Sequence, residues 1–385
     1  MSTPIRHGGD LLAAARRHGR PVEDWLDLST GINPDGYPVP ALPADAWLRL
    51  PQDDDGLAEL AAQAYGAPRA LPVAGSQAAI RTLPQLLKPG RVGVAVQGYS
   101  EYAPAFARAG HEVVPLAETD FVRADLAAQL DHLVVVNPNN PTGRTLAQAT
   151  LRAWHADLAA RGGTLLLDEA FMDCTPERSL AALADRPGLV VLRSLGKFYG
   201  LAGVRCGFVL AEPALLAALA EQLGHWTVAG PARAVARLAL ADRAWQAAAR
   251  ERLQQAGIRL ATLLRKHGLT PVGRPLFSWV PNADAARLHE ALARQGVWTR
   301  LFDAPAGIPG VLPSLRLGLP PAQESAWQRL DAALAQAQAT MRSDTSPFPA
   351  KPDDAYLVHC PCPAGPHHTA GQRPLQPSRR RRFGG

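Results

Sequence analysis

Residues 164–205 read TLLLDEAFMDCTPERSLAALADRPGLVVLRSLGKFYGLAGVR, and this stretch contains two short apolar runs, 164–168 and 189–193. The first run ends at Asp168, and the second leads into a glycine-rich turn that contains Lys197. Continuous rather than alternating hydrophobicity is typical of strands that are covered on both faces, as in a parallel sheet. Ligands bind in the crevice at the carboxyl ends of such strands. The stretch therefore predicts an α/β fold with a polar site near residues 168 and 197.

The same pattern continues on both sides of this stretch. Short apolar runs lie at 92–96, 113–116 and 133–137, and a further run at 208–210 predicts an antiparallel strand. Helical patterns lie at 56–65, 76–87, 102–109 and 145–161. Strands that alternate with helices predict a mainly parallel sheet. We expect them to form one large domain over residues 48–230.

A smaller α+β domain is expected over residues 231–342. The pattern at 231–267 predicts one long helix or two joined helices. It is followed by strand patterns at 277–280, 298–301 and 315–317 and by helical patterns at 282–295 and 321–341. Residues 1–47, with a short helix at 10–19 and a loop at 27–43, are expected to pack with this domain.

The last residues, 343–385, differ from the rest of the chain. They contain eight prolines, few large apolar residues and a run of four arginines at 379–382. Such a segment buries too little apolar surface to fold alone, so it predicts a disordered tail. The group His359, Cys360, Cys362, His367 and His368 contains possible metal ligands, but its spacing fits no standard zinc module. We therefore expect no metal site.

Composition and charge exclude several classes of protein. The chain has 385 residues and a net charge of +6, and the tail alone has one Lys and five Arg against three Asp. The body is thus only mildly basic, which predicts no nucleic-acid partner. No apolar run approaches the ~20 residues of a membrane span, and the N-terminus lacks the apolar region of a signal peptide. We expect a cytoplasmic protein with no membrane partner.

Lys197 has the setting of an amine nucleophile, because a lysine that follows a buried strand can be partly desolvated near a carbonyl group. Ser194 and Arg205 lie three residues before it and eight residues after it, where both could reach one phosphate. The alternative interpretation is an exposed lysine in a glycine-rich loop. A nucleophilic lysine beside a phosphate site points to pyridoxal 5'-phosphate (PLP).

Two more strand ends carry polar residues that a PLP site requires. Asp168 would keep the pyridine nitrogen protonated, so that the ring can accept electrons. Asn140, in the run Asn-Pro-Asn-Asn-Pro-Thr-Gly at 137–143, could donate to the ring oxygen. Taken alone, the aspartate is as well explained by a turn cap, and the asparagine run by a turn. Together with Lys197 they lie at the ends of successive elements, which favours one site.

The start of the helix predicted at 76–87 adds an anion site. Backbone N–H groups at Ser76 and Gln77, with the positive end of the helix dipole, suit a phosphate. A plain N-cap explains Ser76 equally well. Tyr99 and Tyr102 follow the strand at 92–96, and one of them could stack on the ring.

The order and spacing of these motifs resemble the PLP-dependent aminotransferase class I/II family, over about residues 5–340. The resemblance implies the PLP-transferase fold-type I, with a mainly parallel seven-stranded sheet in the large domain, and a homodimer. It also implies that Lys197 forms the internal aldimine, that Asp168 pairs with the ring nitrogen and that Asn140 bonds the ring oxygen. The remaining roles are phosphate binding by Ser76, Gln77, Ser194 and Arg205, ring stacking by Tyr102 and binding of the substrate carboxylate by Arg316.

Two branches of this family take phosphorylated substrates. One decarboxylates L-threonine O-3-phosphate to (R)-1-amino-2-propanol O-2-phosphate in cobalamin biosynthesis, and the other transfers an amino group, as with histidinol phosphate. The opening of this chain, His-Gly-Gly-Asp at 7–10 and Asp-Leu-Ser-Thr-Gly-Ile-Asn-Pro at 27–34, is similar to the first branch. That similarity implies that the substrate phosphate lies near His7, Gly8, Gly31, Ile32, Asn33 and Arg300.

The chain departs from the family pattern at two positions. Phe171 stands where many relatives have a tyrosine that bonds the ring oxygen, and Leu50 stands where relatives have a tyrosine that crosses to the partner subunit. Neither change removes the lysine, the aspartate or the arginine. A rival class, a transcriptional effector domain with a PLP fold, would normally need a DNA-binding module, and residues 1–50 offer no helix-turn-helix pattern.

Overall fold

The computed structural model describes residues 9–304 and 311–343. The described residues belong to one compact unit, so the predicted division into domains stays a prediction. From residue 344 on, the predicted tail and its histidine and cysteine group lie outside the described residues. Within the described ranges, no helix is both long enough and apolar enough to cross a membrane.

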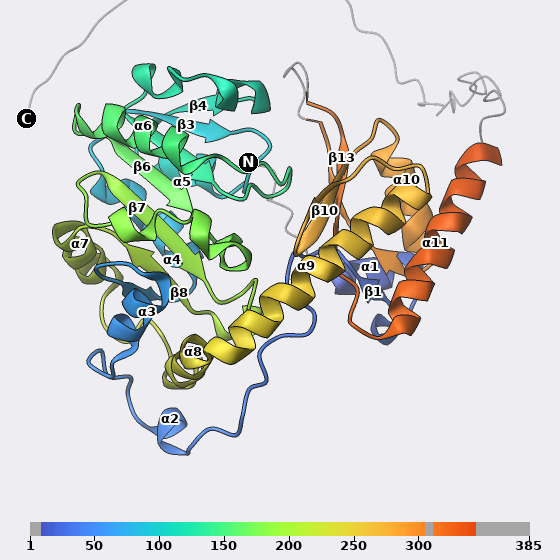
Figure 1. The fold of residues 1–385 in the computed structure, drawn as a ribbon, viewed down its shortest axis with the longest axis horizontal. Coiled ribbons are helices and arrows are strands. Elements are labelled where there is room, and N and C mark those ends of the chain that lie inside the picture. The colour runs from blue at the N-terminus through green and yellow to red at the C-terminus, as the bar shows by residue number, and fades with distance from the viewer. Residues whose placement is uncertain (1–8, 305–310, 344–385) are drawn as a thin grey trace, which may run out of the picture. The chain divides into compact units, whose positions relative to one another are not determined.

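A seven-stranded sheet and the helices packed on it make up what we call the larger part of the described chain (Figure 1). The strand order of this sheet is β2 (Leu71–Val73), β8 (Gly207–Leu210), β7 (Leu189–Ser194), β6 (Thr164–Asp168), β5 (His132–Val136), β3 (Arg91–Ala95) and β4 (Glu112–Leu116). β8 runs antiparallel to both of its neighbours, and every other pair of adjacent strands is parallel. The expected mainly parallel sheet is confirmed.

Successive residues of the strands face two separate apolar cores. Leu133, Val135, Leu165 and Leu167 belong to one core, whereas Val134, Val136 and Leu166 belong to the other. The first core is covered by α3 (Leu57–Tyr65), α6 (Gln148–Ala159) and α8 (Gly230–Ala241), and the second by α4 (Ser76–Leu86), α5 (Tyr102–Arg108) and α7 (Pro213–Leu223). Helices on both faces explain why these strands are apolar throughout.

A four-stranded antiparallel sheet forms the smaller part, in the order β12 (Arg300–Phe302), β13 (Ser314–Gly318), β10 (Phe277–Pro281) and β9 (Val272–Arg274). Its helices are α9 (Arg243–Lys266), α10 (Ala285–Arg294) and α11 (Glu324–Ser343). The N-terminal α1 (Leu11–His18) contacts α10, and β1 (Leu26–Asp27) pairs with β11 (Val297–Trp298). Residues near the start of the chain therefore lie on this smaller part.

The pattern at 231–267 corresponds to two helices, because the chain breaks at Asp242. Its backbone leaves the helical region, and its Oδ1 accepts a hydrogen bond of 2.9 Å from the Trp245 N–H, which caps α9. Sequence patterns missed the short elements β1, β2, β9 and α2 (Asp45–Leu48), as well as α7. Elements of two to four residues are too short for a periodic signal.

Candidate active site

Asp168 ends β6 as a buried carboxylate with two hydrogen-bond donors. It is 4% exposed, its Oδ2 accepts 2.7 Å from the Tyr102 hydroxyl, and its Oδ1 accepts 3.0 Å from the Ala170 N–H. Burial raises the pKa of Asp168, and the two donors and the Lys197 charge act in the opposite direction. A cation placed against this carboxylate would also act to lower the pKa of Asp168. The residue is thus a fixed partner for a positive group.

Lys197 follows β7, the strand that pairs with β6. Burial, and after it the charge of Arg316, lowers the pKa of Lys197 to about 8, although Asp168 acts in the opposite direction. Its Nζ lies 5.7 Å from the centre of the Phe171 ring. A lowered pKa leaves more of the amine neutral at physiological pH, as an amine nucleophile requires.

The turn that carries Lys197 is held by Asn33. The Asn33 N–H donates to the Lys197 carbonyl at 3.0 Å, and its side-chain Nδ2 donates to the Phe198 carbonyl at 2.8 Å. Asn33 is therefore used to position the lysine turn. Of the residues just before Asn33, Gly31 is buried and Ile32 is half-buried. A Cβ on Gly31 would lie 3.0 Å from the Phe171 ring.

The start of α4 is a candidate anion site. Gly75 precedes the helix with φ of +72°, and a Cβ there would lie 2.8 Å from Nη2 of Arg205, so the guanidinium rests against the glycine backbone. A Cβ on Gly207 would lie 2.8 Å from the Ser76 nitrogen, which brings β8 equally close. Ser194 ends β7, the neighbour of β8. A helix N-terminus beside an arginine suits a phosphate.

Gln77 lies in this first turn, but its side chain points to a different network. Its Nε2 donates to Glu101 at 2.8 Å, and its Oε1 accepts from the Tyr99 hydroxyl at 2.9 Å. Its contribution to an anion site would therefore be its backbone N–H, which has no partner within the helix at this position. Tyr102 was expected to stack on a ring, and its ring lies 6.1 Å from that of Tyr99, edge to face.

Arg316 on β13 approaches this region from the smaller part of the molecule. Its guanidinium donates to Oδ1 of Asn140 and, at 2.6 Å, to the carbonyl of Ser29. Its Nε has no hydrogen-bond partner among the described residues. Burial, followed by the charge of Arg300, lowers its pKa to about 10. A buried arginine with an unused N–H group suits a carboxylate ligand.

Arg300 on β12 faces Arg316 in the register of the two strands. The pair places two positively charged side chains on neighbouring strands of the four-stranded sheet. Phe171 contributes no hydroxyl there, and its ring packs edge to face on Phe277 at 5.2 Å. Leu50 is exposed, and His7 and Gly8 lie outside the described residues.

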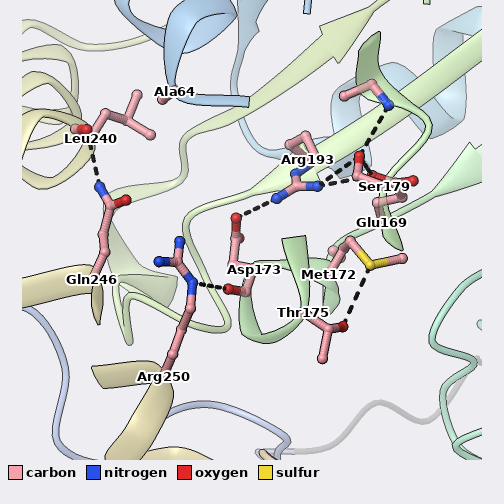
Figure 2. Close-up of polar contacts among 12 residues, drawn as sticks. Ala64, Glu169, Met172, Asp173, Thr175, Ser179, Arg193, Leu240, Gln246 and Arg250 are labelled. Carbon is pink, nitrogen blue, oxygen red and sulfur yellow. Dashed lines mark hydrogen bonds and ion pairs between the residues drawn. The ribbon is translucent and has the colours of Figure 1, made fainter. Parts of the chain in front are cut away.

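Sequence reasoning missed a buried ionic network beside the site, which Figure 2 shows. Arg193, the residue before Ser194, donates to Glu169 at 2.8 Å and also to Asp173. Arg250 of α9 donates to the Asp173 carbonyl at 2.9 Å. Burial acts to lower the pKa of Arg193, but the charges of Asp173 and Glu169 outweigh it and the pKa is raised. The network joins Glu169, which follows Asp168, to Arg193 on β7, the strand that precedes Lys197.

Replacing Arg193 by alanine is expected to lower the free energy of unfolding by about 3–5 kcal/mol, because two buried carboxylates lose their cation. The shift of the urea unfolding midpoint measures this effect. Arg186→Ala is the matched control, since Arg186 is exposed. Equal midpoints for the two variants would contradict a structural role for the network.

Within the described residues, no group of three or more His, Cys, Asp or Glu side chains is placed to hold a metal ion. The polar groups instead fit PLP. Lys197 can take its aldehyde, Asp168 its ring nitrogen and the start of α4 with Arg205 its phosphate. The Nδ2 end of Asn140, for which the described residues offer no hydrogen-bond partner, fits the ring oxygen, because Arg316 occupies its Oδ1.

A two-sided α/β sheet with a half-buried lysine, a buried aspartate and a candidate anion site at its strand ends is typical of an enzyme of the PLP-dependent class. The chain belongs to the aminotransferase class I and II family, whose model matches residues 50–327. It is 56% identical to the threonine-phosphate decarboxylase of Pseudomonas aeruginosa over 86% of this chain and 97% of that protein. It is 44% identical to the threonine-phosphate decarboxylase of a Sinorhizobium species over 83% of this chain and 95% of that protein.

A solved relative has the same fold. The crystal structure of histidinol-phosphate aminotransferase from Sinorhizobium meliloti in complex with PLP superposes with a TM-score of 0.73. The alignment covers 88% of this chain and 99% of that one at 20% sequence identity. At this identity the likeness establishes the fold, and the function has to be argued from the site and from the nearer relatives.

Proposed function

We propose that this chain is a PLP-dependent enzyme that decarboxylates L-threonine O-3-phosphate to (R)-1-amino-2-propanol O-2-phosphate, a reaction of cobalamin biosynthesis. The observation that carries the proposal is the identity of 56% and 44% to two threonine-phosphate decarboxylases over nearly their whole lengths. The site supports it, because the lysine, the aspartate and the carboxylate-binding arginine are all present and close to one another.

Bound PLP supplies an electron sink for the bond that breaks at the α-carbon. Asp168 holds the negative charge that keeps such a sink positive. Lys197 supplies an amine that can bind the aldehyde and move protons at the α-carbon. Arg316 binds the substrate carboxylate with its guanidinium, and its contacts with Asn140 and Ser29 fix the direction from which it does so. Which α-bond breaks depends on this orientation.

The positive charge near Arg316 is proposed to hold the substrate phosphate. Arg300 lies beside Arg316 on the neighbouring strand. Gly31 and Ile32 belong to the same loop as Asn33, next to the lysine turn, so this loop can border the substrate. We propose that His7 and Gly8 contribute to the same subsite. A phosphate there would anchor the end of the substrate opposite to its carboxylate.

The proposal is tested by supplying L-threonine O-3-phosphate to the PLP-loaded protein with no oxo acid present. CO2 release and formation of the aminopropanol phosphate are expected at a steady rate. Addition of 2-oxoglutarate is expected to leave that rate unchanged. Turnover that requires 2-oxoglutarate and produces glutamate would instead identify the histidinol-phosphate type of aminotransferase, and the decarboxylase proposal would be wrong.

We also propose a cytoplasmic homodimer. The α2 segment, which stands away from the sheet in Figure 1, exposes Trp47 and Leu48 at 67% and 81%. Leu50, next to it, is also exposed, and such a group of large apolar side chains is typical of an interaction surface. A second copy of the chain would cover it. Cys174 and Cys206 are free thiols, as expected in a reducing compartment.

Leu48→Glu is expected to shift the protein from dimer to monomer, because a charge in an apolar interface must be desolvated. Light scattering after size-exclusion chromatography measures the mass. The control is Val122→Glu, which places the same charge at an exposed apolar residue elsewhere. A wild-type protein that is monomeric at micromolar concentration would exclude the homodimer.

A further inference from the structure

Two arginines of the four-stranded sheet contact the same turn of the larger part. This turn, residues 137–143, follows β5 and carries Asn140. Arg316 of β13 donates to Oδ1 of Asn140, and Arg274 of β9 donates its Nε to the carbonyl of Gly143. Both strands flank β10 in the sheet. The turn is therefore held at two points by the same sheet, and of the two arginines only Arg316 was expected to serve the reaction.

The contact between Arg274 and Gly143 is closely packed. Gly143 has φ of +72°, a conformation that favours glycine, and a Cβ there would lie 3.1 Å from Cγ of Arg274. Nη1 of Arg274 donates to the carbonyl of Gly273 at 3.0 Å, which fixes the guanidinium against its own strand. Burial, followed by the charge of Arg178, lowers the pKa of Arg274. Arg274 is thus half-buried and donates hydrogen bonds to two backbone carbonyls, those of Gly143 and Gly273.

Val272 of β9 also approaches the turn, because a Cβ on Gly143 would lie 3.4 Å from its Cγ1. A cavity of about 380 Å³ lies beside this contact, and its lining includes Pro138 from the turn and Gly273 and Arg274 from the β9 side. The hydrogen bond from Arg274 to the Gly143 carbonyl is the polar part of the connection between the turn and β9. Its loss would leave the Gly143 carbonyl without this donor.

Hydrogen bonds within the turn connect Gly143 to the segment that carries Asn140. The Gly143 N–H donates to the Asn139 carbonyl at 2.8 Å, and Nδ2 of Asn139 donates to Oγ1 of Thr142 at 2.8 Å. Nδ2 of Asn139 also donates to the Gln97 carbonyl at 2.7 Å, which attaches the turn to the larger part. The turn can therefore form without Arg274, but a shift at Gly143 would move residue 140.

We propose that Arg274 is a positioning residue that keeps Asn140 aligned between Arg316 and the cofactor ring. It touches neither substrate nor cofactor, and it acts through the Gly143 carbonyl. The inference rests on the proposed function only in its choice of substrate. The effect of Arg274 on PLP binding can be measured without any substrate. The Arg274 proposal and the proposed decarboxylase function can therefore fail separately.

Arg274→Gln is expected to raise the Kd of PLP and the KM for L-threonine O-3-phosphate, each by about tenfold, which corresponds to about 1.4 kcal/mol. It is also expected to shift the pH titration of the bound cofactor's absorbance, because Asn140 donates to the ring oxygen. Arg274→Lys keeps a charged donor and is expected to recover part of each effect. The matched control is Arg178→Gln, which lines the same cavity and has no contact with the turn among the hydrogen bonds of the described residues.

A double-mutant cycle separates positioning from plain stability. In the Asn140→Ala background, Arg274→Gln is expected to change the Kd of PLP by less than twofold, because the group that it positions is gone. Full additivity of the two substitutions, or a loss of thermal stability with unchanged Kd, KM and absorbance titration, would overturn the proposal. If Arg274→Gln does not fold, the cycle is run with Arg274→Lys. If the wild type does not turn over threonine phosphate, the Kd of PLP and the pH titration of the bound cofactor's absorbance still test the role of Arg274.

Discussion

Replacement of Lys197 by alanine is expected to lower the rate of CO2 release from L-threonine O-3-phosphate by about 10²–10⁴-fold or more, because we propose that the residue is both the amine nucleophile and the proton carrier. The variant is expected to keep its fold, since the turn is held by backbone contacts with Asn33 that do not involve the lysine side chain. Measured CO2 release and the far-ultraviolet circular dichroism spectrum test the two expectations together.

Two controls make this result specific to the amine. Lys197→Arg keeps a positive charge and is expected to be as inactive as the alanine variant, because a guanidinium stays protonated. In the wild type, the rate at which the PLP-free protein captures PLP is expected to rise as pH increases through about 8, where the lysine loses its proton. An active alanine variant, or capture that falls over this range, would show that another group binds the aldehyde.

The sequence allowed the prediction of the strand ends, and for a clear physical reason. Residues 164–168 and 189–193 are apolar on both faces, because helices cover both faces of the sheet. Parallel strands with this pattern pair in register, and Asp168 indeed lies opposite Leu192, five residues before Lys197. Hydrophobic pattern and spacing were therefore sufficient to place the two groups at one edge.

The contacts between side chains were less predictable. The place of Asn33 near the substrate phosphate stays a prediction, and the structure adds that its amide bonds the lysine turn, a contact across 165 residues that no local pattern reveals. Arg193 lies in an apolar run, and its carboxylate partners become neighbours only when β6 and β7 pair. Arg274 carried no signal at all, because its acceptor is a backbone carbonyl. Such contacts depend on tertiary structure and leave no periodic trace.

Asp168→Asn is expected to lower kcat by about 10²–10⁴-fold, because it removes the buried anion that we propose lies opposite the cofactor's ring nitrogen. Breaking a buried charge pair costs about 3–5 kcal/mol, and each 1.36 kcal/mol is a tenfold change in rate. The asparagine has nearly the same shape, but its single amide oxygen can replace only one of the two carboxylate oxygens that accept from Tyr102 and Ala170. The loss would therefore come from the charge and one hydrogen bond rather than from packing. Steady-state CO2 release and retention of PLP after dialysis measure it.

Tyr102→Phe is the control for this prediction, because it removes only the hydroxyl that donates to Oδ2 of Asp168. The carboxylate keeps its charge and its Ala170 contact, so the expected loss is about tenfold, the value of one hydrogen bond to a charged group. Asp168→Glu retains the charge but displaces it by one methylene, and its rate should fall between the other two. If asparagine and phenylalanine variants lose activity equally, the hydrogen bond and not the charge is what the reaction needs. Only a much larger loss for asparagine assigns to the carboxylate at residue 168 the role of keeping the cofactor ring positively charged.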